Sequence, residues 1–550
     1  MSSFLLKIIL ALSAFQLSGR VVCSPNTAFF SRSNSHIVDV GYAKYLGNFT
    51  EPFSLAFLGV PYAEPPIKDL RFRAPVPLDT DRLRGNDQVI DAASYPDFCI
   101  QGSTGGGDAG GAGSEDCLKI NIYTPVNATS RSKLPVLFYI HGGGYVYGNP
   151  RNWPFEHWIN QSPNVVIVSV YYRLDSFGFL AHPAFSNPSI ADFNVGIKDQ
   201  VLALQWIQDN IAAFGGDPDQ VTINGQSAGG GSVEIHLIAN EGPKRLFSGA
   251  IGQSIYRPTT PLPEQQQPLF DFYAEQAGCG GFRSVEETIS CLRNASISAL
   301  ARAQDAGASF NSNGSYYKGW LPAVDGKLIP DYPTKLLAEE KFAHVPAISG
   351  ATSNETGGSD IMEYLRQAYP LLTSSELRAY SRVYDRSQFS SDDEWIRTAT
   401  GEPSLRCGRE TVGFAGVKHS KAWTYRYNQP NPTQNEPGIT EHAAENWMMF
   451  LGTNTGFNGT NVFTGLNSVE KAFSEELIAY WLSFVRAKDP NKFKLARSAV
   501  WPDFSTGRRA VLQQSLDNET SSGSIFVEKE FVGDTKRCAF VASLVNHMQN

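Results

Sequence analysis

Two apolar segments with a helical pattern between them precede a serine that lies among glycines, and this order constrains the fold most strongly. Residues 165–172 (VVIVSVYY) and 221–224 (VTIN) are rich in β-branched residues, as in strands that are buried on both faces. Residues 196–214 place apolar side chains at helical spacing and end before GGDP, a helix stop signal. A strand, a helix and a second strand in this order predict a parallel α/β sheet.

The same kind of pattern recurs along the chain. Three further apolar runs are predicted to be strands: residues 134–140, 345–350 and 422–427. A chain of 550 residues can form two domains or one large domain with insertions. The intervals near 260–320 and 356–420 show no regular alternation of strands and helices, so we expect helical and loop insertions there. Such insertions usually shape a binding pocket.

The sequence GQSAG (residues 225–229) follows the strand predicted at 221–224 directly. A serine in this pattern can occupy a sharp strand-to-helix turn, where the glycines let the strand and the helix approach each other. The motif alone is short enough to occur by chance in a glycine-rich loop. Because the preceding strand and helix supply the required context, we predict that Ser227 is a nucleophile.

A serine nucleophile also needs donors for the negative charge that develops on its substrate. The sequence HGGGYVYG (residues 141–148) follows the strand predicted at 134–140. Glycine amides are not covered by side chains, so we expect the N–H groups of Gly143 and Gly144 to form an oxyanion hole with that of Ala228. The alternative is a tight turn without a chemical role.

The general base is sought among the histidines that follow the serine, because the acid and then the histidine come later in the chain in this architecture. His442 lies in a turn-rich segment after the strand predicted at 422–427. The other later histidines precede a strand, or belong to the helix after the serine or to the C-terminus. We therefore predict that His442 is the base and that Glu445, three residues on, helps to hold it.

The acid is expected on a loop just past the strand predicted at 345–350. Glu355 has this position, and Asp360 is the alternative. A carboxylate there would hold the imidazole tautomer and stabilise the imidazolium that forms during attack. Residues 354–356 are also a formal glycosylation sequon. Because a glycan would obstruct the acid, we expect Asn354 to be unmodified.

The N-terminal region predicts export from the cell. Residues 4–15 form a short apolar stretch followed by small and polar residues, so we expect residues 1–24 to be a signal peptide and the mature protein to be secreted. No later segment reaches the length of a spanning helix, and we expect no stable membrane anchor. A net charge of -8 without a long basic run argues against a nucleic-acid partner.

The sequence offers no clear site for a metal or cofactor. The glycine-rich stretch at 102–113 is not followed by Gly-Lys-Ser/Thr, as a phosphate-binding loop would be, and reads as a surface loop. The cysteines form no C-x-x-C pair. We therefore expect neither a metal nor a cofactor.

Cysteines and glycosylation sequons fit the predicted export. Beyond Cys23, which lies at the end of the signal region, the chain has an even number of cysteines: Cys99, Cys117, Cys279, Cys291, Cys407 and Cys538. Such a set suggests disulfides, and the two close pairs suggest local loops, but sequence alone leaves the pairing open. Candidate glycosylation sites are Asn48, Asn127, Asn160, Asn294, Asn313, Asn458 and Asn518.

These motifs together resemble the type-B carboxylesterase/lipase family of cholinesterase-like α/β-hydrolases. The most specific segment is FGGDPDQVTINGQSAG (residues 214–229), and the similarity extends over nearly the whole mature chain, through SEDCLKINIYTP, GATSNETG and EHAAENW. The resemblance implies a single α/β-hydrolase domain over residues 25–550, with a mostly parallel sheet. It implies Ser227, Glu355 and His442 as the triad, and it supports the disulfides Cys99–Cys117, Cys279–Cys291 and Cys407–Cys538.

Departures from the family pattern bear on the substrate. Gln226 replaces the usual glutamate before the serine, and the loop between Cys99 and Cys117 lacks the tryptophan that cholinesterases use against a quaternary ammonium group. That loop is short and almost free of apolar residues, unlike the amphipathic lid of the fungal lipases. We therefore expect small soluble esters as substrates. The alternatives are a lipase or sterol esterase that acts on lipid esters, and a non-catalytic binding protein of the same family.

Overall fold

The structure is a computed structural model that describes residues 36–84, 88–102, 113–239, 245–307, 310, 319–433, 438–455, 461–514 and 525–550. The predicted signal peptide (residues 1–24), most of the glycine-rich loop and the sequons at Asn313, Asn458 and Asn518 lie outside these residues. Residues 36–550 form one compact unit. No helix in the described ranges is both long and apolar enough to cross a bilayer.

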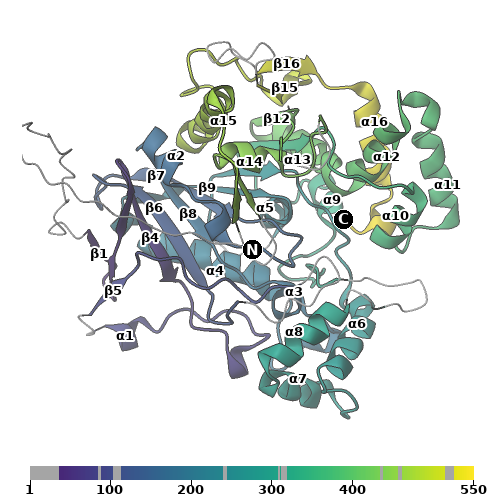
Figure 1. Ribbon diagram of the computed structural model, residues 1–550. Coiled ribbons are helices and arrows are strands. Elements are labelled where there is room, and N and C mark those ends of the chain that lie inside the picture. Colours follow the sequence, from purple (N-terminus) through teal and green to yellow (C-terminus); the bar gives the residue numbers. More distant parts are fainter. Residues whose placement is uncertain are drawn as a thin grey trace, which may run out of the picture. The chain divides into compact units, whose positions relative to one another are not determined.

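A large mixed sheet organises this unit (Figure 1). Its strands, in spatial order, are β16 (Phe526–Lys529), β15 (Arg508–Leu512), β12 (Ala422–Tyr427), β11 (Ala347–Thr352), β10 (Gly249–Gln253), β9 (Gly216–Gln226), β7 (Leu134–Ile140), β8 (Val166–Val170), β6 (Lys119–Pro125), β4 (Ser54–Pro61) and β3 (Asn48–Glu51). Every neighbouring pair from β15 to β8 is parallel, and the strands at both edges are antiparallel. The predicted α/β fold with a mostly parallel sheet is confirmed.

The five predicted strands are all present: those predicted at 134–140 and 422–427 match β7 and β12 at both ends, and the other three have shifted ends. The strand predicted at 221–224 lies in the second half of β9, which starts at Gly216 and so includes the last three residues of the GGDP segment. The helix predicted at 196–214 is α4 (Val195–Asn210), followed by a single 3-10 turn at Ile211–Phe214. The chain therefore changes from helix to strand at Gly215, whose φ of 87° favours glycine.

Alternating residues of the central strands pack into two separate cores on the two faces of the sheet. In β7, Phe138 and Ile140 belong to one core with Leu204 of α4, whereas Tyr139 belongs to the other core with Trp481 of α15 (Ser468–Ala487). Because both faces are covered by helices, the strands are apolar on both sides. This burial explains why the sequence shows continuous apolar runs and no polar–apolar alternation.

The two expected insertions are largely helical. The first holds α6 (Pro263–Gln276), α7 (Val285–Asn294) and α8 (Ile297–Ala306), and the second holds α10 (Ile361–Ala368), α11 (Ser374–Val383), α12 (Asp392–Gly401) and α13 (Cys407–His419). Figure 1 shows α6–α8 together in one group and α10–α12 beside α16 (Val532–Ser543) in another. The second group has its own apolar core, which includes Leu365, Tyr380 and Val541.

The six remaining cysteines form the three disulfides that the resemblance implies. Cys279–Cys291 closes the connection between α6 and α7, Cys407–Cys538 joins α13 to α16, and Cys99–Cys117 closes the glycine-rich loop at its base. Among the described candidate glycosylation sites, Asn48, Asn127 and Asn294 are exposed, and Asn160 is half-buried in α2 (Glu156–Gln161).

Candidate active site

Ser227 lies on the tight turn between β9 and α5 (Ala228–Ile238). Its φ of 60° and ψ of -125° place it in a strained region of conformational space for a residue with a side chain. A Cβ atom on Gly225 would lie 2.3 Å from the backbone of Gly229, and one on Gly229 would lie 2.0 Å from the carbonyl oxygen of Ile140. The glycines are therefore required by close backbone contacts, and the turn has the geometry of a nucleophile elbow.

The structure brings Ser227, His442 and Glu355 into one relay. The Ser227 hydroxyl donates to His442 Nε2 at 2.8 Å, and His442 Nδ1 donates to Glu355 Oε2 at 2.6 Å. Asp360, the alternative acid, is instead the N-cap of α10 and accepts from the amides of Met362 and Glu363. Glu355 is therefore the acid that contacts the histidine.

The loops that carry the acid and the histidine are joined directly to each other. The amide of Asn354 donates to the carbonyl of Thr440 at 3.0 Å, and the amide of Thr440 donates to the side-chain oxygen of Asn354 at 3.3 Å. The second Glu355 carboxylate oxygen accepts from the amide of Thr352 at 2.7 Å. Glu355 is thus fixed relative to β11, and the loop of His442 is fixed relative to Glu355.

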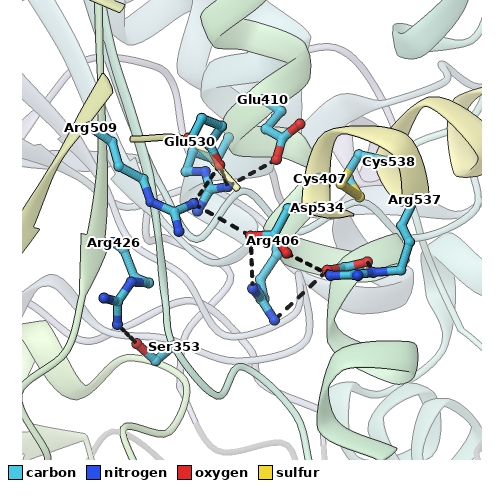
Figure 2. A network of polar contacts seen from close by, with 12 residues as sticks. Ser353, Arg406, Cys407, Glu410, Arg426, Arg509, Glu530, Asp534, Arg537 and Cys538 are labelled. Atoms are coloured by element: carbon cyan, nitrogen blue, oxygen red, sulfur yellow. Dashed lines mark hydrogen bonds and ion pairs between the residues drawn. A yellow bond between two sulfur atoms is a disulfide. The ribbon is translucent and has the colours of Figure 1, made fainter. Parts of the chain in front are cut away.

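A charged side chain supports the acid loop from the next strand. Arg426 of β12 donates to the Ser353 hydroxyl at 2.9 Å, and it makes a two-point ion pair with Glu528 of β16. Figure 2 shows Arg426 pointing at Ser353, beside a larger network of ion pairs that joins α13, β15 and α16. The turn that carries Glu355 is therefore connected, through Arg426, to the edge strand β16.

Two carboxylates set the protonation of His442. Burial alone would lower the pKa of its imidazole, but the hydrogen bond and charge of Glu355, together with the charge of Glu445, outweigh it and raise the pKa. Glu445 is itself buried, and burial with the nearby charge of Glu355 raises its pKa to about 7. The predicted influence of Glu445 is therefore electrostatic, since the structure shows no hydrogen bond between its carboxylate and His442 among the described residues.

The three candidate oxyanion donors lie on two segments, the loop after β7 and the first residue of α5. Gly143 and Gly144 have φ of 111° and 64°, and among the described residues neither amide donates to another group of the chain. Ala228 is the first residue of α5, where backbone amides lack a partner from a preceding turn. Gly143, Ser227 and His442 line one cavity of about 240 Å³. This arrangement can stabilise a tetrahedral intermediate formed on Ser227.

Apart from Gln226, the walls of the cavity were not predicted from the sequence. They consist of aromatic and amide side chains together with Thr453: Tyr147, Trp153, Trp447, Gln226, Asn431 and Asn446. The Asn446 side chain donates to the oxygen of Gln226 at 3.2 Å, and the Gln226 nitrogen lies 3.5 Å from His442 Nε2. Tyr147 and Asn446 lie within the motifs HGGGYVYG and EHAAENW, so their closeness in sequence to the candidate site residues could have indicated them. Trp153 and Asn431 carry no sequence signal.

Two groups of metal-ligand side chains cluster elsewhere in the described part of the chain: Glu402 with Cys407 and Cys538, and Glu410 with Glu530 and Asp534. The two cysteines are oxidised to a disulfide, which has no thiolate to offer. In the second group, Arg409 donates to Glu410 and Glu530 at 3.0 and 2.6 Å. Arginine thus supplies the positive charge there, and we assign neither group to a metal.

Fold and site together define an α/β-hydrolase. The carboxylesterase family model matches residues 35–402. The chain is 30% identical over 530 residues to carboxylesterase 1D of Rattus norvegicus, covering 87% of this chain and 89% of that protein. It is 30% identical to secreted lipase 1 of Botryotinia fuckeliana, covering 82% and 84%. The crystal structure of Aspergillus niger EstA matches 94% of this chain and 100% of its own, with a TM-score of 0.82 and 31% identity. The chain therefore belongs to the carboxylesterase family and is a carboxylic ester hydrolase.

Replacement of the acid gives a test of the relay that does not depend on activity. In Glu355→Gln the imidazolium loses both its charged acceptor and the nearest negative charge, so the pKa of His442 should fall. The ring resonances of histidine-labelled protein, followed by NMR against pH, measure this change. Glu441→Gln is a matched control, because it removes a carboxylate one residue from His442 that is not among those that shift the pKa of the ring. An unchanged titration of His442 in Glu355→Gln would contradict the relay.

Proposed function

We propose that this protein is a secreted serine carboxylesterase that hydrolyses carboxylic esters through an acyl-enzyme on Ser227. The observation that carries the proposal is the 2.8 Å contact between His442 Nε2 and the Ser227 hydroxyl, beside amides that donate to no other described group. A serine hydroxyl is a weak nucleophile, and it requires both a base at this distance and a stabilised oxyanion.

The mechanism uses only groups of the chain and water. Ser227 Oγ attacks the ester carbonyl carbon while its proton passes to His442 Nε2, and the oxyanion accepts hydrogen bonds from Gly143, Gly144 and Ala228. Glu355 stabilises the imidazolium. His442 then donates the proton to the leaving alkoxide as the ester C–O bond breaks. Water, deprotonated by His442, attacks the acyl carbon; His442 then returns the proton to Ser227 Oγ as the bond from Oγ to the acyl carbon breaks and the carboxylic acid leaves.

The cavity favours uncharged esters. No aspartate, glutamate, lysine or arginine lines it among the described residues, and Gln226 stands next to the nucleophile as a neutral amide. A choline ester would therefore meet aromatic rings but no countercharge. Aromatic and amide walls suit a compact ester whose acyl or alcohol part carries a hydrogen-bonding group.

Export is supported by three observations. The N-terminal apolar stretch has the composition of a signal peptide, the chain has three disulfides, and one relative is named a secreted lipase. Disulfides persist in oxidising compartments outside the cytosol. We therefore place the mature protein outside the cell.

A fluorophosphonate probe tests the nucleophile. Wild-type protein should be labelled covalently on Ser227, and Ser227→Ala should lose the label together with at least about 10⁴-fold in kcat. Ser232→Ala is a matched control, because this buried serine of α5 lies one helical turn beyond the elbow. An unlabelled wild-type protein, or a label that survives in Ser227→Ala, would refute the acyl-enzyme.

The substrate class is tested with nitrophenyl esters of increasing acyl length and with emulsified triolein. Because the sequence between Cys99 and Cys117 has almost no apolar residues with which to contact a lipid surface, short soluble esters should be the better substrates. The rate should not rise when a substrate passes its solubility limit. Strong activation by the emulsion would instead favour the lipase or sterol esterase alternative.

A further inference from the structure

The first half of the oxyanion loop, residues 141–148, is held by a backbone turn within the loop and by one side chain from outside it. The carbonyl of Gly143 accepts from the amides of Val146 and Tyr147 at 3.0 and 3.1 Å, which closes a tight turn. The Tyr172 hydroxyl donates to the carbonyl of His141 at 2.9 Å. Amides stabilise an oxyanion only if they are fixed before the reaction begins. The amides of Gly143 and Gly144 are therefore fixed only if the second half of the loop is held in place as well as the first.

The second half is held from outside by two residues at the base of the Cys99–Cys117 loop. The side-chain nitrogen of Gln101 donates to the carbonyl of Gly148 at 2.5 Å, and the amide of Gly148 donates to the side-chain oxygen of Gln101 at 3.2 Å. The amide of Gly102 donates to the carbonyl of Val146 at 2.9 Å. Gln101 is fully buried, and its amide pairs with Gly148 as a neighbouring strand would.

Gly148 connects Gln101 to the oxyanion donors Gly143 and Gly144, because it packs against the residues that precede them. Its φ is 144°, and a Cβ atom there would lie 2.1 Å from His141 Nδ1 and 2.6 Å from the carbonyl oxygen of Gly142. Gly148 therefore packs directly against the two residues that precede Gly143. In such close packing, a displacement of Gly148 displaces Gly142 and the amide that follows it.

Gln101 is itself held in place on its other side. Its carbonyl accepts from the side-chain nitrogen of Gln304 in α8 at 3.1 Å, and the oxygen of Gln304 accepts from the Ser176 hydroxyl at 2.7 Å. The Cys99–Cys117 disulfide lies two residues before Gln101. The hydrogen bonds of Gln101 thus connect the oxyanion loop to the first helical insertion and to a covalent crosslink.

We propose that Gln101 is a positioning residue, which holds the amides of Gly143 and Gly144 where the oxyanion develops. The inference rests on the proposed function. Only an amide side chain donates to the Gly148 carbonyl and accepts from the Gly148 amide at this length. A methionine would leave both groups buried without a partner, and a glutamate would place an acceptor against a carbonyl.

The test compares Gln101→Met and Gln101→Glu with wild-type protein on a soluble nitrophenyl ester. Both variants should lose about 10- to 100-fold in kcat with little change in KM, because misplaced donors act on the transition state and not on bound substrate. The inhibition constant of a trifluoromethyl ketone, which forms an oxyanion on the nucleophile, should rise by the same factor as kcat/KM falls. The affinity for the product carboxylic acid should be unchanged.

Gln266→Met is the matched control. Gln266 of α6 is equally buried, and its amide has no hydrogen-bond partner among the described residues, so its replacement should leave kcat and ketone affinity unchanged. If Gln101→Met does not fold, Gln101→Glu keeps the shape and one acceptor and supplies the test. A stability loss in folded Gln101 variants, with kcat and ketone affinity as in wild type, would overturn the inference.

The outcomes also separate this inference from the proposed function. Wild-type protein that is neither labelled by a fluorophosphonate nor inhibited by the ketone would refute the acyl-enzyme itself. Wild-type protein that is labelled on Ser227 while the Gln101 variants keep full ketone affinity would refute only the role of Gln101.

Discussion

A single imidazole joins three parts of the chain that are far apart in sequence. A neutral histidine has one N–H donor and one lone-pair acceptor, and the two cannot be exchanged once one partner is fixed. Because Glu355 accepts from Nδ1, Nε2 is left to accept from Ser227. The carboxylate thus fixes the tautomer, and the tautomer makes the serine a nucleophile. The fold must therefore hold two loops and one turn within hydrogen-bond distance of each other.

The parallel sheet provides this arrangement. Ser227, Glu355 and His442 follow β9, β11 and β12. These strands are parallel, so their carboxyl ends lie at the same end of the sheet, and the oxyanion loop follows β7 at that end. Specific contacts then refine the distances. Asn354 and Thr440 join the acid and histidine loops, Arg426 supports the acid loop from the neighbouring strand, and close glycine packing orients the serine.

The sequence predicted the parts that depend on local pattern. β7 and β8 were predicted from continuous apolar runs, α4 from the helical spacing of its apolar residues, and Ser227 from the GQSAG pattern directly after a predicted strand. β10 was not identified, because its sequence GAIGQ has two glycines and a single β-branched residue. It is a strand through its parallel pairing with β9 and β11.

The rest of the site depends on contacts between distant residues. Position after the predicted strand favoured Glu355 and left Asp360 as the alternative, and only the structure shows that Asp360 caps a helix. Trp153, Asn431 and Gln101 carry no motif of their own, because each acts through where the folded chain places it. Burial of Glu445 beside Glu355, and with it the raised pKa, likewise exists only in the folded protein.

A crystal structure of the protein inhibited by a methylphosphonate ester would show the nucleophile, the base and the oxyanion donors around one ligand. We expect phosphorus bonded to Ser227 Oγ and the phosphoryl oxygen about 3 Å from the amides of Gly143, Gly144 and Ala228. His442 should keep its contact with Glu355. Phosphorus on another residue, or a phosphoryl oxygen that points away from these amides, would contradict the proposed mechanism.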